Sequence, residues 1–313
     1  MDKFLSCDWG TSTFRLRLID RETLTVIAEE KNDNGVAKTH RHWLEEGSDA
    51  NTRQTFYGAI IATKIKNLSK RLNNSFAGIP VIISGMISSA IGMIDIPYKE
   101  VPVALDGSDL LIKRLFIDGC DNELIIISGI KTADNIMRGE ETQVIGCSFF
   151  ADDAEEILVV FPGTHSKHVI IKNRQIIDFK TYMTGEFFDL LSTQSILSAS
   201  IQKNDTFNTD EFKNGVTDSM AGDLLQTAFR VRTNTVLKNM PKDSNWHYLS
   251  GLVIGNELKS LLNYNHPVYL CGGNDLMHRY QLACDVLGIT ISLQIDSTTA
   301  LLSGQKYILN TTS

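Results

Sequence analysis

Two segments of the chain, about half its length apart, contain residue types that could hold phosphate groups. The first is Asp8-Trp9-Gly10-Thr11-Ser12, which follows the mostly apolar residues 4–7, and the second is Pro162-Gly163-Thr164-His165-Ser166-Lys167, which follows the apolar residues 157–161. Glycine at such a turn lets backbone N–H groups and hydroxyls approach phosphate oxygens without an intervening Cβ. A returning strand is indicated after each turn. We therefore predict two β-hairpins that bind phosphate.

The carboxylate of Asp8 would repel a polyphosphate unless a cation lay between them. Mg²⁺ keeps several of its waters and takes one or two carboxylates together with phosphate oxygens. We therefore expect Asp8 to hold Mg²⁺ through water. The residues expected to contact phosphates lie in the two turns and on the first returning strand: Gly10, Thr11, Ser12, Arg15, Gly163, Thr164, His165, Ser166 and Lys167.

A third segment completes a nucleotide-binding pattern. An apolar strand is predicted over residues 268–270, and Gly272-Gly273-Asn274 follows it and opens a helix. Two glycines there would let a flat adenosine lie against the backbone, although a lone Gly-Gly pair is as often an ordinary strand-to-helix turn. The chain contains neither G-x-x-x-x-G-K-[ST] nor G-x-G-x-x-G. The three segments in this order indicate ATP, with its adenosine at Gly272, Gly273 and Asn274.

The elements between these segments alternate between strands and helices, which indicates an α/β fold. Strands are predicted at residues 81–83, 124–127 and 268–270, and helices at 52–72, 133–150, 185–198, 218–237, 247–262 and 275–287. A chain of 313 residues exceeds the size at which a single core usually stops growing. We predict two related domains, residues 1–153 and 154–313, with a boundary in the acidic run 152–156 and the active site in the cleft between them.

Composition narrows the class of partner. A net charge of −7 and a pI near 5.5 argue against a nucleic-acid surface, which needs clustered Lys and Arg. The five cysteines are odd in number and lack C-x-x-C spacing, so we expect reduced thiols in the cytosol. Neither a secretory leader nor an apolar run of membrane-spanning length is indicated. We expect a cytoplasmic protein without a membrane partner, and a homo-oligomer stays open.

At this point a family resemblance covers nearly the whole chain. The residues that carry it are Asp8-Trp9-Gly10-Thr11-Ser12, Ser84-Gly85-Met86, Met137-Arg138-Gly139-Glu140-Glu141-Thr142-Gln143, Pro162-Gly163-Thr164-His165-Ser166-Lys167, Met183-Thr184-Gly185-Glu186 and Tyr248-Leu249-Ser250-Gly251. The chain resembles the actin-like, hexokinase-type ATPases, which have two ribonuclease H-like domains and an interdomain ATP and substrate cleft. Within them it resembles the 2-dehydro-3-deoxygalactonokinase family. The resemblance implies a carbohydrate kinase that transfers the ATP γ-phosphate to the 6-hydroxyl of 2-dehydro-3-deoxygalactonate in galactonate breakdown.

The resemblance also implies a substrate site, formed by Ser84, Gly85, Met86, Arg138 and Glu186. The sequence departs from the family pattern at residues 87–93, where many members carry an Arg and a Trp. If that Arg holds the substrate carboxylate, another cation must do so here; the candidates are Lys99, Arg138 and Lys167. A kinase for another 2-keto-3-deoxy acid or a ketose therefore stays open, as does an actin-like ATP-binding switch without a sugar substrate. Sugar-dependent release of ADP distinguishes the kinases from the switch.

Phosphoryl transfer needs a carboxylate that orients the attacking hydroxyl, together with fixed geometry and charge stabilisation. Glu140 and Glu141 are the candidates, because they precede the second hairpin as a Gly-Asp-Gln-Gln run does in related sugar kinases. Acidic residues also favour a helix N-terminus through the dipole, whatever their chemistry. That explanation weakens if the pair lies in the middle of a continuous helix over 133–150. The choice between Glu140 and Glu141 stays open.

Overall fold

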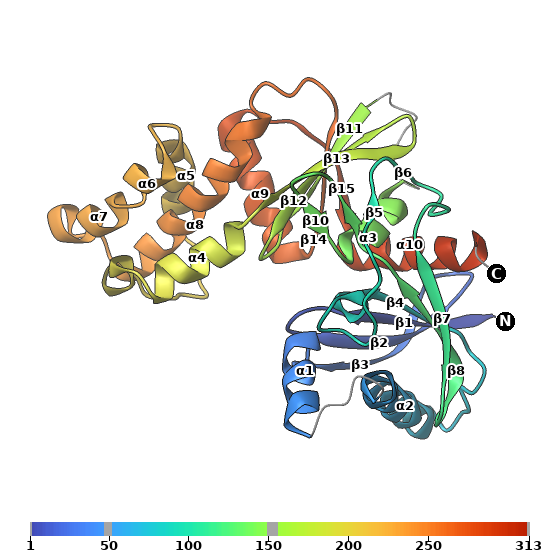
Figure 1. Cartoon of the computed structure of the whole chain (residues 1–313). Coiled ribbons are helices and arrows are strands. Elements are labelled where there is room, and N and C mark those ends of the chain that lie inside the picture. The colour runs from blue at the N-terminus through green and yellow to red at the C-terminus, as the bar shows by residue number, and fades with distance from the viewer. Residues whose placement is uncertain (1, 47–51, 149–155, 312–313) are drawn as a thin grey trace. The chain divides into compact units, whose positions relative to one another are not determined.

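The computed structural model describes residues 2–46, 52–148 and 156–311, and the chain divides into two compact units (Figure 1). Unit 1 consists of Met1–Asp152, Arg174–Asp178 and Thr298–Ser313, and unit 2 of Asp153–Asn173 and Phe179–Ser297. The predicted boundary at 153/154 lies outside the described residues. The C-terminal segment groups with unit 1, whereas the sequence-based division assigned it to the second domain. The cleft predicted between the domains stays a prediction.

Unit 1 contains a six-stranded sheet with the order β3-β2-β1-β4-β8-β7. Its strands are β1 (Lys3–Trp9), β2 (Phe14–Asp20), β3 (Val26–Asn32), β4 (Val81–Gly85), β7 (Ile112–Ile117) and β8 (Cys120–Ile127). Strands β1, β2 and β3 are antiparallel neighbours, whereas β4 and β8 run parallel to β1. The carboxyl ends of β1 and β4 therefore meet at one edge of the sheet.

Helices cover both faces of this sheet (Figure 1). They are α1 (Val36–Glu45), α2 (Arg53–Leu72), α3 (Glu140–Cys147) and α10 (Ser297–Thr311), with a 3₁₀ turn, η1 (Met86–Ser88), after β4. Helix α2 buries Tyr57, Ile61 and Ile65 in the core on one face. On the other face, Gln305 of α10 donates to the Cys7 carbonyl (3.3 Å) and to Ser84 Oγ (3.0 Å). These contacts explain why the C-terminal helix belongs to unit 1.

Short strands complete unit 1. Strands β5 (Lys99–Glu100), β9 (Ile130–Lys131) and β10 (Ile136–Met137) form a small sheet with the order β10-β9-β5. Strand β6 (Val103–Ala104) pairs with the first residues of β13 (Gln175–Tyr182), which begins in unit 1 and ends in unit 2.

The sheet of unit 2 repeats the strand order of unit 1. The strands follow the order β15-β14-β11-β12-β13, after which β6 is the sixth strand. Besides β13, the strands of unit 2 are β11 (Glu156–Phe161), β12 (Ser166–Lys172), β14 (Val268–Gly272) and β15 (Ile291–Asp296). Strands β11 and β12 are antiparallel, and β14 and β15 run parallel to β11. The first unit has the equivalent order β8-β4-β1-β2-β3. The predicted α/β class, both hairpins and the ribonuclease H-like repeat are confirmed.

The remaining elements of unit 2 are helical. They are α4 (Thr184–Thr193), η2 (Ile196–Ser200), α5 (Thr209–Ser219), α6 (Leu224–Thr227), α7 (Arg230–Lys238), α8 (Lys242–Leu258), η3 (Lys259–Leu261) and α9 (Asn274–Leu287). Helices α5 and α8 pack backbone to backbone, since a Cβ at Gly215 or at Gly251 would lie 2.0 Å from a carbonyl oxygen of the other helix.

Four predicted helices are wrong in part. The helix predicted over 185–198 ends at Thr193, before the 3₁₀ turn η2, and the helix predicted over 247–262 begins earlier, at Lys242, and ends at Leu258, before η3. The helix predicted over 133–150 begins only at Glu140, because the Thr132 hydroxyl accepts the N–H groups of Asp134 and Asn135 and forms a turn. Gly139 then has a φ of +115°, which no helix contains. The end of that prediction, residues 149–150, lies outside the described residues.

The helix predicted over 218–237 is three helices, α5, α6 and α7. Helix α5 begins at Thr209, where the Asn208 side chain accepts the Glu211 N–H (3.1 Å) as an N-cap. The chain leaves the helical conformation around Gly222 before α6. The cap and this break move the helix boundaries away from the predicted ones.

Candidate active site

Three elements of unit 1 converge at the carboxyl ends of β1 and β4. Asp8 pairs with Ser84 across the parallel strands, and Trp9 pairs with Gly85. Gly85 has a φ of +101°, and a Cβ there would lie 2.7 Å from the Trp9 carbonyl oxygen. A Cβ on Gly139, which precedes α3, would lie 3.3 Å from the Gly85 Cα. Glycine at both positions therefore lets the start of α3 approach the two strand ends.

Asp8 is accessible at this junction, with 29% of its side chain exposed. Arg15, its cross-strand neighbour, places Nη1 at 3.9 Å from Asp8 Oδ2. Burial raises the pKa of Asp8; the positive charges of Arg15 and Arg17 oppose this shift, and the negative charge of Glu140 adds to it. The Glu140 carboxylate thus lies close enough to Asp8 to act on its pKa.

The two candidate base residues have different surroundings. Glu141 is fully buried and accepts the Gly139 N–H (2.6 Å) and the Thr142 hydroxyl (3.2 Å). Burial, with the neighbouring charge of Glu140, raises the pKa of Glu141 to about 8. Glu140 is half-buried, and its carboxylate accepts the Arg138 N–H at 3.2 Å.

The start of α3 at Glu140 bears on the roles of Glu140 and Glu141. Because α3 begins at Glu140, both acidic residues lie in its first turn rather than in the middle of a helix. The dipole explanation therefore applies to both. It describes Glu141 more closely, because that carboxylate binds the N–H of the N-cap residue Gly139. Glu140 is the one that lies towards Asp8.

Arg138 lines an open pocket of about 630 Å³ in unit 1. The pocket is lined by Met86, Ser89, Ala90, Ile91, Asp95, Ile96, Pro97, Tyr98, Lys131 and Arg138. Arg138 is only 8% exposed, and its guanidinium donates to the carbonyl and hydroxyl of Ser88 and to the Ile96 carbonyl (3.2 Å). Its Cζ lies 4.1 Å from the centre of the Tyr98 ring.

The guanidinium of Arg138 has no counter-charge among residues 2–46, 52–148 and 156–311. Its Nε is buried without a hydrogen-bond partner, and no ion pair involves Arg138 within the part of the chain that the structure describes. An unpaired buried charge is costly, which favours an anionic ligand in the pocket.

The other predicted cations lie elsewhere. Lys99 is 3.9 Å from Asp109 and is not among the residues that line the pocket. Lys167 is in unit 2 and donates to the His165 carbonyl (2.8 Å). Lys131, which sequence reasoning missed, lines the pocket from a two-residue strand without any local motif. Residues 89–91 of the segment that departs from the family pattern also line it.

The first hairpin turn is held by the N-terminus of α1. The carbonyls of Gly10 and Thr11 accept the N–H groups of Val36 (2.9 Å) and Ala37 (3.2 Å). A Cβ at Gly35 would lie 2.2 Å from the Thr11 carbonyl oxygen. With these carbonyls bound from behind, the exposed Thr11 and Ser12 face solvent. Sequence reasoning missed Gly35, which lies outside the hairpin.

The second hairpin turn is held in the same way by α4. The Thr164 carbonyl accepts the Glu186 N–H (3.1 Å), and a Cβ at Gly185 would lie 2.7 Å from the Gly163 carbonyl oxygen. Thr164 and His165 are exposed at the tip, where the His165 ring contacts the Glu186 carboxylate. The predicted site residue Glu186 therefore lies beside the second turn.

Three predicted site residues face the interior rather than a ligand. Ser166 is fully buried, with its hydroxyl 2.8 Å from that of Tyr280. Lys167 is buried apart from 4% of its surface. The Ser84 hydroxyl is fully buried between Thr142 and Gln305. These three residues support the turns and strand ends from behind.

Three of the predicted ligand-binding glycines have open space where a side chain would project. A Cβ at Gly10 or Gly163 would meet no atom closer than 3.8 Å, and a Cβ at Gly273 would meet none within 4 Å. None of the three has a φ in the left-handed region. The protein's own packing does not require glycine at these positions, whereas a nucleotide lying against the backbone would.

The adenosine segment lies next to the second hairpin. Strand β14 is parallel to β11, so Gly272 follows the same sheet edge as the Gly163 turn, and a Cβ on it would lie 3.5 Å from Pro162 Cδ. Gly273 and Asn274 are exposed at the start of α9. The arrangement fits a nucleotide whose adenosine and phosphates follow two adjacent strand ends.

A metal ion at Asp8 would need further ligands from the phosphate oxygens of a bound nucleotide. Among residues 2–46, 52–148 and 156–311, no group of three or more His, Cys, Asp or Glu could hold a metal. Mg²⁺ prefers one or two carboxylates with water and phosphate oxygens, so Asp8 alone fits that role.

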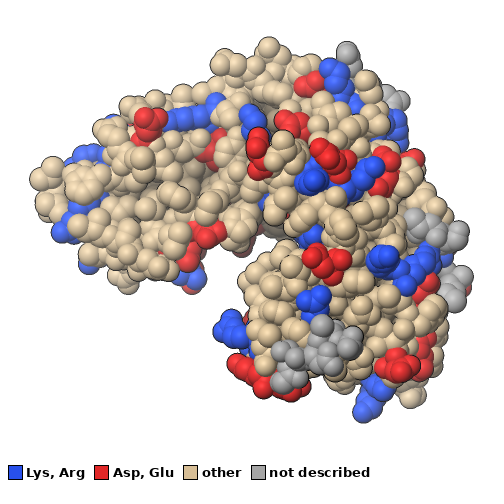
Figure 2. All heavy atoms as spheres, viewed as in Figure 1, with Lys and Arg blue, Asp and Glu red and all other residues tan. Residues whose placement is uncertain are grey.

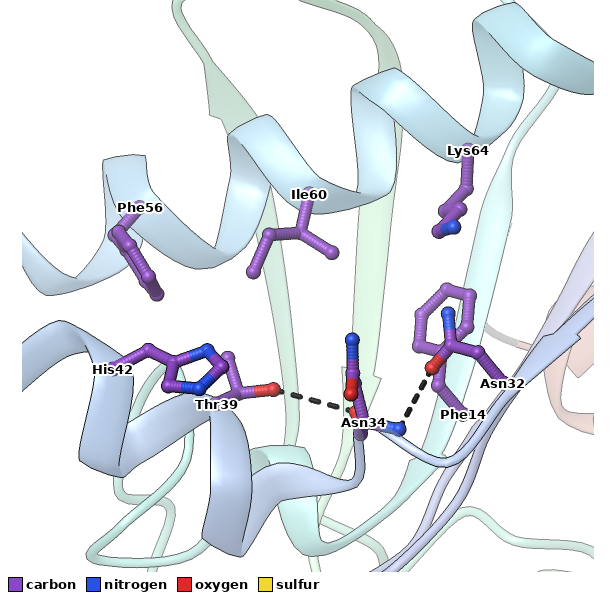
Figure 3. A pocket seen from close by; sticks show the side chains of 8 residues that line it. All are labelled: Phe14, Asn32, Asn34, Thr39, His42, Phe56, Ile60 and Lys64. Carbon is purple, nitrogen blue, oxygen red and sulfur yellow. Dashed lines mark hydrogen bonds between the residues drawn. The ribbon is translucent and has the colours of Figure 1, made fainter.

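A second pocket lies behind the first hairpin, between β2, β3, α1 and α2 (Figure 3). It has a volume of about 240 Å³ and is lined by Phe14, Asn32, Asn34, Thr39, His42, Phe56, Ile60 and Lys64. The Asn34 carbonyl accepts both Trp9 Nε1 (3.1 Å) and the Thr39 hydroxyl (3.3 Å). It contains none of the predicted site residues, and its polar groups tie the loop before α1 to β1.

Surface charge and membrane propensity complete the description. On the face drawn in Figure 2, Lys and Arg side chains are interspersed with Asp and Glu. This face therefore carries no broad basic patch among the described residues. No helix in the described part of the chain has the length and apolar character to cross a bilayer. The five cysteines are buried and have free thiols.

Comparison with known proteins identifies the family. A model of the 2-keto-3-deoxy-galactonokinase family matches residues 8–307. The 2-dehydro-3-deoxygalactonokinase of Escherichia coli (strain K12) is 34% identical over 236 residues, which cover 73% of this chain and 78% of that protein. A Rhizobium meliloti (strain 1021) protein provisionally given the same name is 30% identical over 315 residues, covering 96% of this chain and 94% of that protein.

A solved structure agrees with these sequence matches. The crystal structure of a Sinorhizobium meliloti protein, provisionally described as a 2-dehydro-3-deoxygalactonokinase, has a TM-score of 0.82 and 28% identity. The match covers 98% of this chain and 96% of that chain. The chain therefore belongs to the 2-keto-3-deoxy-galactonokinase family of ATP-dependent carbohydrate kinases.

Proposed function

We propose that the protein transfers the γ-phosphoryl group of ATP to the 6-hydroxyl of 2-dehydro-3-deoxy-D-galactonate in galactonate catabolism. The observation that carries this proposal is the segment Arg138-Gly139-Glu140. It puts a buried guanidinium, without an ion-pair partner among the described residues, two positions from a carboxylate that lies close to Asp8. One segment thus supplies a cation for a sugar acid and a carboxylate for its hydroxyl.

Both units contribute to ATP binding in this proposal. The exposed turn residues Thr11 and Ser12 of unit 1, and Thr164 and His165 of unit 2, contact phosphate oxygens through N–H groups and hydroxyls. Arg15 adds positive charge beside Asp8. Bound Mg²⁺, held by Asp8 through water, would neutralise charge that develops on the phosphates.

The adenosine is assigned to unit 2. It lies against Gly272 and Gly273, with Asn274 at the exposed start of α9. The open space beside Gly273 supports this assignment.

In this proposal Glu140 orients the attacking hydroxyl, and Glu141 holds the Glu140 side chain in position. Glu140 is partly exposed and close to Asp8, whereas the Glu141 carboxylate is buried against Gly139 and Thr142. A buried carboxylate with these partners fixes the start of α3 and with it the direction of Glu140. Phosphoryl transfer asks mainly for positioning from such a base.

The substrate carboxylate binds in the pocket that Arg138 and Lys131 line. Met86 lines the same pocket, while Gly85 lets α3 approach. Residues 89–91 form part of the pocket wall. In this proposal, the departure from the family pattern therefore affects which sugar acid the pocket accepts. A kinase for another 2-keto-3-deoxy acid is the second candidate, and this altered wall favours it. The buried free thiols support a cytoplasmic location.

The test is ADP release by the purified protein with ATP and Mg²⁺. It is measured without a sugar, with 2-dehydro-3-deoxygalactonate, with its gluconate epimer and with several ketoses. The proposal predicts strong and selective stimulation by the galactonate compound. Selective stimulation by the epimer or by a ketose would identify that compound as the substrate and keep the kinase activity. Slow ADP release that no sugar changes would contradict a kinase and favour the ATP-dependent switch.

A further inference from the structure

A buried carboxylate lies beneath the second hairpin in unit 2. Glu257 of α8 is 4% exposed, and three polar groups surround its carboxylate. His168 Nε2 lies 2.9 Å from Oε1, the Tyr280 hydroxyl donates to Oε2 at 2.6 Å, and the Thr184 hydroxyl also donates to Oε2. One carboxylate therefore joins β12, α4, α8 and α9.

This cluster continues to the backbone of the phosphate turn. The Tyr280 hydroxyl lies 2.8 Å from Ser166 Oγ, and Ser166 Oγ accepts the Gly163 N–H at 3.3 Å. A carboxylate only accepts hydrogen bonds, so the hydroxyl hydrogen of Tyr280 points to Glu257. Tyr280 can then accept from Ser166, which leaves Ser166 lone pairs for the Gly163 N–H. The charge of Glu257 thus sets the direction of the Tyr280 hydrogen bond and leaves Tyr280 as an acceptor for the Ser166 hydroxyl, which also lies 3.4 Å from the Gly163 carbonyl oxygen.

The first hairpin does without such a cluster at the equivalent turn. There the Gly10 N–H binds the backbone carbonyl of Thr13 at 3.0 Å. The support behind it is aromatic: the Trp9 ring lies 4.7 Å from that of Phe14 and 5.3 Å from that of Tyr57, centre to centre. The fold therefore tolerates an apolar support at this place. Buried ionic groups are seldom better than apolar ones for stability, so stability alone does not explain Glu257.

We propose that Glu257 and Tyr280 are positioning residues for the second phosphate turn. They act through Ser166 on the Gly163 peptide and so fix where the exposed N–H groups of Thr164 and His165 meet the nucleotide. Tyr280 also belongs to α9, whose first residue is Asn274 of the adenosine segment. One hydroxyl thus couples the phosphate turn to the helix that carries the other end of ATP. This inference rests on ATP binding as proposed above.

The decisive variant is Tyr280→Phe, which removes the linking hydroxyl and keeps the buried ring. The matched control is Tyr248→Phe. Tyr248 is equally buried in unit 2, and its hydroxyl donates to the Asp218 carboxylate at 2.7 Å, outside the Glu257 cluster. Both changes remove one tyrosine hydroxyl from a carboxylate and keep the buried ring, although the bond lost in Tyr248→Phe is only partly buried. A purely structural role of Tyr280 therefore predicts nucleotide constants that are the same in the two variants.

The readouts are the Kd for ADP by calorimetry, the KM for ATP and for the sugar acid, and the unfolding midpoint. We expect Tyr280→Phe to raise the ADP Kd and the ATP KM about five- to tenfold, the factor for one lost hydrogen bond of ordinary net strength. The sugar KM stays unchanged, and Tyr248→Phe changes neither nucleotide constant. Equal nucleotide constants in the two variants, with only the unfolding midpoint lowered, would overturn the proposal.

A double variant tests the route through Ser166. Ser166→Ala should weaken ADP binding about as much as Tyr280→Phe, and the combination should be no weaker than either alone, because both break one chain. If the two changes multiplied in their effect on the ADP Kd, the proposed series of hydrogen bonds through Tyr280 and Ser166 would be contradicted. Calorimetry needs no turnover, so wild-type protein that binds ADP without any sugar-stimulated ADP release would sink the kinase proposal but not this one. Wild-type protein that binds no nucleotide would sink both.

Discussion

The two hairpins have the same backbone plan and different chemistry. In each, a glycine turn follows a central strand and is held from behind by the start of a helix that has a glycine in close contact with the turn, Gly35 before α1 or Gly185 in the first turn of α4. The first turn carries Asp8 two residues before its glycine, whereas the second carries Phe161 there. Behind the first turn lie aromatic rings, and behind the second lies the Glu257 cluster.

The difference indicates a division of labour between the two units. Unit 1 brings carboxylates to its strand ends, together with the buried Arg138 guanidinium, which has no ion-pair partner among the described residues; this suits acid–base and metal chemistry. Unit 2 brings the exposed Thr164 and His165 at a turn with a polar support, which suits binding of the nucleotide. The repeat thus supplies two phosphate turns, and the side chains around them decide what each turn does.

Removing the Asp8 carboxylate, which has no equivalent in the second hairpin, should produce the largest effect. We expect Asp8→Asn to lower kcat by about 10³-fold, the loss typical of one group that stabilises transition-state charge. The control is Asp20→Asn. Asp20 ends β2, far along the hairpin from Asp8, and its carboxylate accepts the Thr23 N–H (2.9 Å). Steady-state rates of both variants give the comparison. A kcat close to wild type in Asp8→Asn would remove the metal role.

The next effect distinguishes two neighbouring carboxylates within unit 1. We expect Glu140→Gln to lower kcat by about 10²- to 10³-fold, as for loss of a general base. Glu141→Gln keeps an oxygen for the Gly139 N–H and should keep most of the activity. Rates measured on both variants decide the assignment. The reverse pattern would make Glu141 the base.

Glu141 should instead reveal itself in the pH dependence of stability. Its folded-state pKa of about 8 exceeds the ordinary value of 4.5, so the folded protein holds this proton more tightly than the unfolded chain. The stabilisation is complete below pH about 4.5 and is lost as the pH rises through about 8. Relative to Glu141→Gln, the wild-type free energy of unfolding should fall by roughly 2–4 kcal/mol over that range. Parallel pH profiles for the two proteins would show an ordinary pKa.

The smallest effect concerns substrate recognition, which we assign to unit 1 alone. Lys131→Met should raise the KM for the sugar acid about tenfold with kcat kept, the signature of lost uniform binding. Lys99→Met is the matched control, since Lys99 is paired with Asp109 and does not line the pocket. The ATP KM should not change in either variant. Equal sugar KM values for the two variants would exclude Lys131 from the site.

Much of this plan was predictable from local sequence. Both hairpins and the strand before Gly272 follow from apolar runs that end in glycine and hydroxyl residues. These features depend on residues close together in the chain.

The missed residues depend on distant contacts. Lys131 and Tyr98 line the Arg138 pocket from a short strand and a loop without a motif. Glu257 is a single acidic residue in an otherwise buried helix, which was the one available sign of a polar cluster. The start of α3 was missed because the left-handed φ of Gly139 is imposed by its close approach to Gly85.

The most direct test of the paired phosphate turns is the ATP KM and the unfolding midpoint of Gly10→Ala and Gly163→Ala. Neither added methyl meets a protein atom closer than 3.8 Å, so the account predicts unchanged or slightly higher midpoints. It predicts that both changes raise the ATP KM about tenfold, because the methyl occupies the place of a phosphate. An unchanged ATP KM in either variant, at an unchanged midpoint, would contradict phosphate binding at that turn.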